Sequence, residues 1–150
     1  MNQRHISNIR TKLIPFILRE HGSGFGMSTW ISVAKPGTKV RFDDVTRRFP
    51  CSGTVACIGG SVELLSHKHT SIGQAKWLGL TDYEYHILCH RWEPSDCGFT
   101  DYHWPLAYVQ QFKKAKNSLA KAKVAVRLLE EVIRTKGKCL HSARSQHDLS

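Results

Sequence analysis

Apolar residues near the start of the chain recur every three or four positions, which is the spacing of a helix with one buried face. Between residues 5 and 20 the pattern consists of Ile6, Ile9, Leu13, Phe16 and Ile17. Pro15 lies inside this segment and lacks a backbone N–H, so we expect the helix to end or kink there. Three glycines then predict a loop: Gly22, Gly24 and Gly26.

The longest pattern covers residues 105–136 and predicts the principal helix, with Gly137 at its end. Apolar positions separated alternately by four and three residues form an a/d heptad seam: Tyr108, Phe112, Ala115, Leu119, Ala122, Val126, Leu129 and Ile133. The seam could pack on the chain's own helices. Alternatively it could join a homodimer through Phe112, Leu119, Val126, Leu129 and Ile133. Asn117-Ser118 is a point where the helix could break in two.

A second helix is expected between these segments. Thr54 is a good N-cap, and the helix would run from Val55 to about Leu65. Its small residues, including Gly59 and Gly60, are unfavourable for an isolated helix. They therefore predict a buried helix that a neighbouring element approaches closely.

Two shorter helices should follow. One is expected over residues 71–79, where Gly79 ends it. Thr81 and Glu84 form a capping box, in which each side chain bonds a backbone N–H at the start of the helix. This box opens a further helix that ends at about His90.

Together these patterns predict an all-α domain of about five helices over residues 1–137, followed by a flexible tail over residues 138–150. A loop is expected at residues 91–103. Residues 31–50 leave room for a short hairpin, because Lys39-Val40-Arg41-Phe42 alternates in polarity.

Charge indicates what this domain contacts. Lys and Arg number 22 and Asp and Glu 12, which gives a net charge of +10. Such an excess favours contact with polyanions: nucleic acid, an anionic membrane surface or an acidic protein. The alternative interpretation is a solvated surface with a general basic bias, because charge alone has little specificity.

A stretch of fifteen residues in the principal helix contains six cations and no acid. The cations are Lys113, Lys114, Lys116, Lys121, Lys123 and Arg127. They lie off the heptad seam, so the apolar residues remain available for packing. Such a stripe binds phosphates through counterion release, without sequence specificity. We predict that it binds nucleic acid, and the alternative is a solvated helix face.

Cysteine usage and hydropathy bear on location. Five cysteines, an odd number, agree with a reducing compartment in which thiols stay free. The apolar run at residues 13–18 is too short to span a membrane and contains a proline. We therefore expect a cytoplasmic protein with no membrane partner.

Several short segments carry a family resemblance. Residues 52–60 read Ser-Gly-Thr-Val-Ala-Cys-Ile-Gly-Gly, with Phe25-Gly26-Met27-Ser28-Thr29-Trp30 upstream. Leu78-Gly79-Leu80-Thr81 and Trp104-Pro105 follow downstream. In this order the segments resemble a family of small bacterial and phage proteins with the signature Cys-Gly-Thr-x-x-Cys-Ile-Ala/Gly-Gly. The likeness covers residues 5–110.

One departure concerns the first cysteine of the signature. Ser52 follows Cys51, so Cys51 and Cys57 are one residue farther apart than in the family, which weakens a paired-thiol role. The resemblance implies a helical fold and a bacterial or phage origin, and it implies no activity. On the residues alone, we expect Cys57 and Ile58 to fill the core and Cys51 to be more accessible.

Cysteine and histidine spacings predict neither a metal site nor another cofactor. Structural zinc sites use cysteine pairs two to four residues apart, and Cys51 and Cys57 are too widely separated. A zinc ion, if one binds, would use Cys89, Cys97 and His103.

A second similarity gives an enzymatic alternative. Phe49-Pro50-Cys51-Ser52-Gly53 is similar to the Asp-Cys-Ser-Gly start of papain-like cell-wall peptidases of the NlpC type, although proline replaces the aspartate. In those enzymes the cysteine lies at a helix N-terminus, which lowers its pKa. The similarity implies a thiol hydrolase with Cys51 as nucleophile and a histidine partner among His86, His90 and His103.

The leading hypothesis is a non-enzymatic binding or regulatory protein of bacterial or phage origin that acts through a protein partner or nucleic acid. The thiol hydrolase is the alternative.

Overall fold

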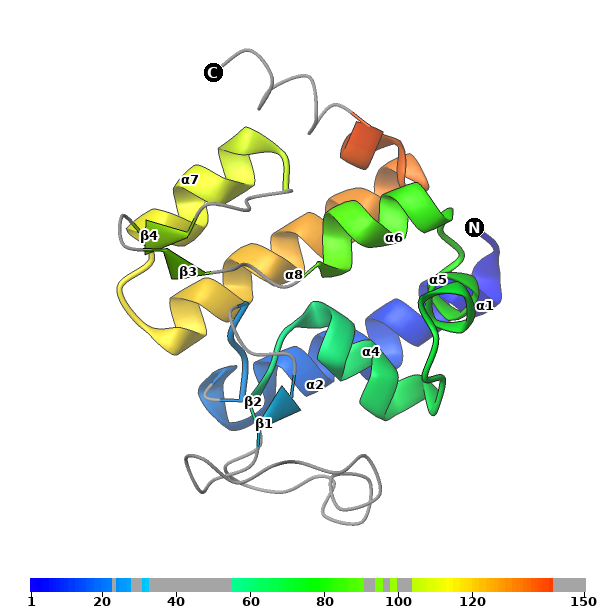
Figure 1. Cartoon of the computed structure of the whole chain (residues 1–150), viewed down its shortest axis with the longest axis horizontal. Coiled ribbons are helices and arrows are strands. Elements are labelled where there is room, and N and C mark those ends of the chain that lie inside the picture. Colours follow the sequence, from blue (N-terminus) through cyan, green and yellow to red (C-terminus); the bar gives the residue numbers. More distant parts are fainter. Residues whose placement is uncertain are drawn as a thin grey trace.

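The computed structural model of the chain describes residues 1–22, 24–27, 31–32, 55–90, 94–95, 98–99 and 104–141. Within these residues the fold is mainly helical, as predicted, and a long helix lies near the C-terminal end (Figure 1).

The N-terminal helical segment continues through Pro15, and its backbone changes direction at Arg19, where ψ is 145°, before a last 3-10 turn. It comprises α1 (Gln3–Ser7), the π-helix η1 (Asn8–Leu13), α2 (Ile14–Leu18) and the 3-10 helix η2 (Arg19–Gly22). Of the two outcomes expected at Pro15, an end of the helix was wrong, and a kink stays a prediction. A proline deprives the carbonyl four residues earlier of its donor. Immediately before it, the N–H of Ile14 donates to the carbonyl of Ile9, so the π-helix changes the pairing ahead of the proline.

Helix α4 (Ile58–Ser66) begins later than expected. Residues Val55–Ala56 form strand β2, and the N-cap is Cys57, whose Sγ accepts the N–H of Gly60 at 3.4 Å. The prediction of Thr54 as the cap was wrong because the chain is still extended at residues 55–56, and Thr54 itself lies outside the described residues. The predicted burial is confirmed, since the buried positions of the helix include Gly59, Gly60 and Ser61.

Helices α5 (Ser71–Leu78) and α6 (Asp82–Cys89) match the sequence prediction. Gly79 follows α5 with φ at 73°, a left-handed conformation that favours glycine. The capping box of α6 is present. The N–H of Thr81 donates to Glu84 Oε1 at 2.9 Å, and the N–H of Glu84 donates to Thr81 Oγ1 at 3.2 Å.

The predicted principal helix is two helices, α7 (Leu106–Lys114) and α8 (Ser118–Thr135). The break predicted at Asn117-Ser118 is confirmed. Asn117 is the N-cap of α8, and its Oδ1 accepts the N–H of Ala120 at 2.8 Å. This bond starts a new helix at the point where the earlier one has turned away.

The domain extends beyond the predicted boundary at residue 137. Gly137, with φ at 87°, donates its N–H to the carbonyl of Val132 at 2.8 Å and helps end α8, as expected. The chain then forms the 3-10 helix η3 (Lys138–His141) rather than a frayed tail. Leu140 is fully buried, and this apolar side chain holds the segment on the core. Residues 142–150 lie outside the described residues.

Two short strand pairs accompany the helices. Strand β1 (Ile31–Ser32) pairs antiparallel with β2 (Val55–Ala56), so the partner of the first strand lies beyond the predicted hairpin at residues 31–50. Residues 39–42 lie outside the described part of the chain. Strands β3 (Pro94–Ser95) and β4 (Gly98–Phe99) pair within the predicted loop.

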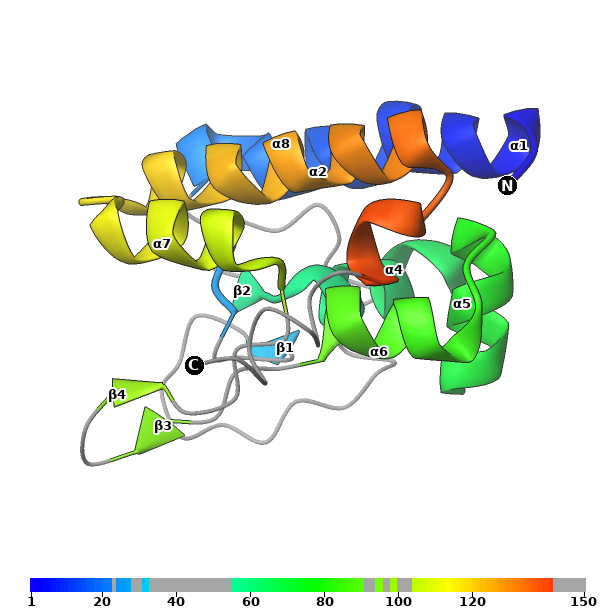
Figure 2. The same cartoon turned by 90° about the horizontal axis from the view of Figure 1, so that it is seen from above.

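The helices are arranged in two layers (Figure 2). The N-terminal segment, α8 and α7 form one layer, and α4, α5 and α6 form the other. Helix α8 packs against both α7 and α2, and its buried residues are Ala122, Val124, Ala125, Leu128, Leu129, Val132 and Ile133. Among the described helices, none is both long and apolar enough to span a membrane.

Candidate functional site

The turn between α7 and α8 lies at one edge of the molecule, on the left in Figure 1, and the six predicted nucleic-acid-binding cations lie along the chain from the end of α7 through this turn to the middle of α8. We call this surface the basic elbow, and it consists of Lys113, Lys114, Lys116, Lys121, Lys123 and Arg127. All are exposed except Lys121, which is half-buried. Helices α7 and α8, which carry these cations on either side of the turn, pack against each other.

Two of these cations are held by the helices themselves. Lys121 Nζ lies 5.7 Å from the centroid of the Phe112 ring, and Arg127 Nε donates to Gln111 Oε1 at 3.2 Å. The acids of α8 lie farther along the helix. Glu130 pairs with Arg10 at 3.3 Å, and Glu131 pairs with Arg134. The carboxylates of α8 therefore pair with cations outside the basic elbow, and the elbow keeps its positive charge.

The heptad seam lies mainly inside the molecule. Phe112, Leu129 and Ile133 are buried in the chain's own core, and Leu119 and Val126 are partly buried. Of the two arrangements open from the sequence, the structure has the intramolecular one. The three buried side chains are thus not available for the predicted homodimer.

A pocket of about 420 Å³ opens among α4, α5 and α6. Its lining residues are Glu63, His69, Ser71, Gln74, Tyr85, His86, Cys89 and His90. Three of these residues were candidates from the sequence. His86 and His90 were candidate partners of a nucleophilic cysteine, and Cys89 was a candidate zinc ligand. His86 and His90 are one helical turn apart, and their ring centroids are 4.7 Å apart.

The pocket walls also include residues that sequence reasoning missed. Glu63, Gln74 and Tyr85 come from three separate helices, α4, α5 and α6, and no spacing in the sequence links them. Tyr85 donates its hydroxyl to Gln74 Oε1, and Gln74 Nε2 donates to the carbonyl of Lys68 at 2.8 Å. Burial raises the pKa of Tyr85 far above its usual value, so the phenol stays protonated.

Neither Cys57 nor Cys89 has the properties of a nucleophile. Cys89 is fully buried, and burial raises the pKa of its thiol well above the usual range. Cys57 lies at a helix N-terminus but is also fully buried, as predicted for a residue that fills the core. A reactive thiol needs exposure and a lowered pKa, and Cys89 has neither.

Some predicted residues fall outside the described part of the chain. These are Cys51, Cys97 and His103, so the thiol hydrolase and the zinc alternative remain predictions. Within the described ranges, no group of three or more His, Cys, Asp or Glu side chains is arranged to hold a metal ion.

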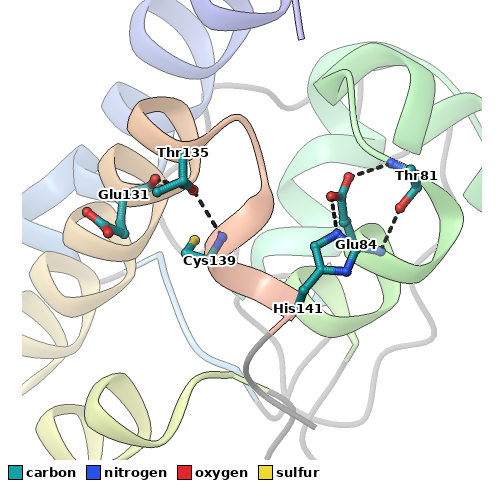
Figure 3. A network of polar contacts seen from close by, with 6 residues as sticks. All are labelled: Thr81, Glu84, Glu131, Thr135, Cys139 and His141. Atoms are coloured by element: carbon teal, nitrogen blue, oxygen red, sulfur yellow. Dashed lines mark hydrogen bonds and ion pairs between the residues drawn. The ribbon is translucent and has the colours of Figure 1, made fainter. Parts of the chain in front are cut away.

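A buried carboxylate connects the C-terminal turn to α6 (Figure 3). Glu84 is 6% exposed, and its Oε2 lies 2.7 Å from His141 Nε2. The His141 ring stacks on Tyr83 with centroids 5.5 Å apart. Burial acts to raise the pKa of Glu84, but hydrogen bonds from Thr81 and His141 outweigh it and hold the pKa below the usual value.

Most of the described residues in the segments that carry the family resemblance are buried. Trp104 is fully buried and donates Nε1–H to the carbonyl of Leu88 at 3.0 Å. Phe112 lies between two signature rings, with centroid distances of 5.5 Å to Trp104 and 6.5 Å to Phe25. The described residues of these segments therefore build the fold rather than a binding surface.

No family model matches the chain, and neither a curated protein nor a solved structure matches it. The resemblance to the bacterial and phage family therefore remains a prediction.

Proposed function

We propose that the protein is a non-enzymatic, cytoplasmic binding protein whose basic elbow contacts nucleic acid through its phosphates. The observation that carries this proposal is the cluster of six cations at the α7–α8 turn. The described carboxylates of the same helix pair with Arg10 and Arg134. Phosphate binding by such a surface gains from counterion release and needs no base contact.

The elbow is suited to a backbone contact in particular. Its cations are carried by two helices and a short turn, so the backbone positions that bear them are set before binding. The ring of Phe112, the aromatic residue closest to these lysines along the chain, is buried. Stacking on single-stranded bases is therefore disfavoured, and a duplex is the better partner.

The test compares two variants that lose the same charge. The elbow variant carries Lys114→Gln, Lys116→Gln and Lys123→Gln, which keeps helix propensity nearly constant. The control variant carries Lys12→Gln, Lys136→Gln and Lys138→Gln, three exposed lysines elsewhere on the surface. Both lower the net charge from +10 by three.

Fluorescence anisotropy with a labelled DNA duplex at several salt concentrations measures the outcome. We expect the elbow variant to bind at least about tenfold more weakly near 0.15 M salt, with a salt slope reduced by up to about 2.7. The control variant should bind almost as the wild type does. A wild type that does not bind, or a control that loses as much affinity as the elbow variant, would contradict the proposal and favour a protein partner.

A further inference from the structure

A second concave surface lies between α1 and α5, at the end of the molecule opposite the basic elbow (Figures 1 and 2). It has a volume of about 620 Å³, within the range of roughly 300–1,000 Å³ that is usual for small-molecule sites. We call it the α1–α5 groove. It is larger than the histidine-lined pocket and independent of it, because the two share no lining residue.

The charge of the groove is positive. Arg4, Lys68 and Lys76 line it, and among the residues that the structure describes no carboxylate pairs with any of the three. His5 also lines the groove, and its Nδ1 accepts the N–H of Asn2 at 3.0 Å. Burial lowers the pKa of His5, so the imidazole is neutral near pH 7 and the three long side chains supply the charge.

The residues that line the groove include a buried polar side chain with an unused acceptor. Asn8 is 7% exposed, and its Nδ2 donates to the carbonyl of Trp77 at 3.0 Å. This bond orients the amide. Within the described residues, no donor reaches its Oδ1. Buried acceptors in folded proteins are usually satisfied, so an unused one lining a groove indicates a ligand that donates a hydrogen bond.

The remaining wall is apolar. Ile72 is 56% exposed although its side chain is large and hydrophobic, and Trp77 is half-buried beside it. An aromatic side chain in a concave, cationic surface suits a flat ring on the ligand. The first turn of α5, with Thr70 as its N-cap, adds partial positive charge at the same end.

We propose that the α1–α5 groove binds a phosphomonoester that carries a flat, hydrogen-bond-donating ring, the chemical class of a nucleoside monophosphate. Arg4, Lys68 and Lys76 would hold the phosphate. Trp77 and Ile72 would cover the ring, and Asn8 Oδ1 would accept a hydrogen bond from its amino group. This small-molecule site is separate from the duplex-binding surface proposed above.

Isothermal titration calorimetry with three probes tests the ligand class. The probes are adenosine 5′-monophosphate, adenosine and inorganic phosphate, each titrated into the full-length protein at low salt. We expect the nucleotide to bind at least about tenfold more tightly than either part, because each part leaves half of the groove unused. Phosphate that binds as tightly as the nucleotide, or a nucleotide that does not bind, would overturn the proposal.

Two sets of variants test the location. The groove variant carries Arg4→Gln, Lys68→Gln and Lys76→Gln, all at exposed positions whose change leaves the core intact. It should bind the nucleotide at least about tenfold more weakly while it keeps its affinity for the DNA duplex. The elbow variant should bind the DNA duplex more weakly and keep its affinity for the nucleotide. If the groove variant loses duplex binding and keeps nucleotide binding, the groove belongs to the polyanion surface and the proposal is wrong. The proposal for the basic elbow would not be affected by that result, because duplex binding by the elbow variant tests it separately.

Discussion

Helices α4 and α8 both pack on the core, but α4 is buried over most of its surface, whereas α8 is buried on one face only. Six of the nine residues of α4 are buried, and they include Gly59, Gly60 and Ser61, which admit close neighbours. Helix α8 buries one face and leaves Lys123 and Arg127 exposed on the other. The first helix supports the fold, whereas the early part of the second presents charge. The two can therefore be altered independently.

The largest expected effect comes from adding bulk to α4. Gly60→Leu should destabilise the protein by about 3 kcal/mol or more, because the new side chain has to enter a filled core. The matched control, Lys123→Leu, places the same side chain on the exposed face of α8 and should change stability by less than about 0.5 kcal/mol. Urea denaturation followed by circular dichroism measures both. Equal midpoints for the two variants would show that this part of α4 is not closely packed.

A smaller effect should come from the contact between α5 and the N-terminal segment. A Cβ on Gly79 would lie 2.4 Å from His5 Nδ1, and Gly79 also has a positive φ. Gly79→Ala should therefore cost about 2–3 kcal/mol, from backbone strain and overpacking together.

A double-mutant cycle separates these two contributions. In a His5→Ala background the clash with the imidazole ring disappears, whereas the backbone strain and the close approach to the Cβ of residue 5, at 2.9 Å, remain, so Gly79→Ala should still cost about 1–2 kcal/mol. Thermal unfolding of the four proteins measures the coupling. An unchanged cost in the His5→Ala background would mean that the imidazole moves aside freely.

The smallest effect concerns pH and the Glu84–His141 contact. The pKa of Glu84 is lower in the folded than in the unfolded protein, so its contribution is present above the unfolded pKa of about 4.3. The contribution is lost as the pH falls through the folded pKa. Glu84→Gln keeps an oxygen for the Thr81 cap and removes the charge, and it should cost about 1 kcal/mol at pH 6.

Thermal midpoints between pH 6 and pH 3 check this prediction. The difference between wild type and Glu84→Gln should shrink towards zero as the pH falls below about 4. A difference that is constant over this range would show that the charge of Glu84 adds nothing to the contact.

Helix ends were predictable wherever a side chain with a strong local preference defines them. Thr81 and Glu84, Gly79 and Asn117 all act as the sequence indicated. The start of α4 was missed because Val55 and Ala56 pair with residues 31–32. That pairing joins distant parts of the chain, and no local pattern reports it. A thiol is also a weak acceptor, so Cys57 is not an obvious cap.

The binding surfaces also differ in whether their residues are close together in the sequence or far apart. The basic elbow was predictable because all its cations lie within one short stretch of sequence. The histidine-lined pocket was only half predictable. His86 and His90 share a helix face, but Glu63 reaches them through the packing of α4 on α6. The α1–α5 groove joins residues about seventy positions apart, and no spacing rule connects them.

The position of α8 in its layer determines the order in which the chain can fold as it is synthesised. The contact between Arg10 and Glu130 joins residues 120 positions apart, and Ile9, Leu13 and Ile17 are buried in the same core as α8. At roughly 5–20 residues per second, a ribosome needs about 6–24 s to make the intervening chain. During that time the N-terminal segment has made its apolar face but lacks the helix that covers it. A nascent-chain chaperone would therefore be most useful early in translation, well before the basic elbow emerges.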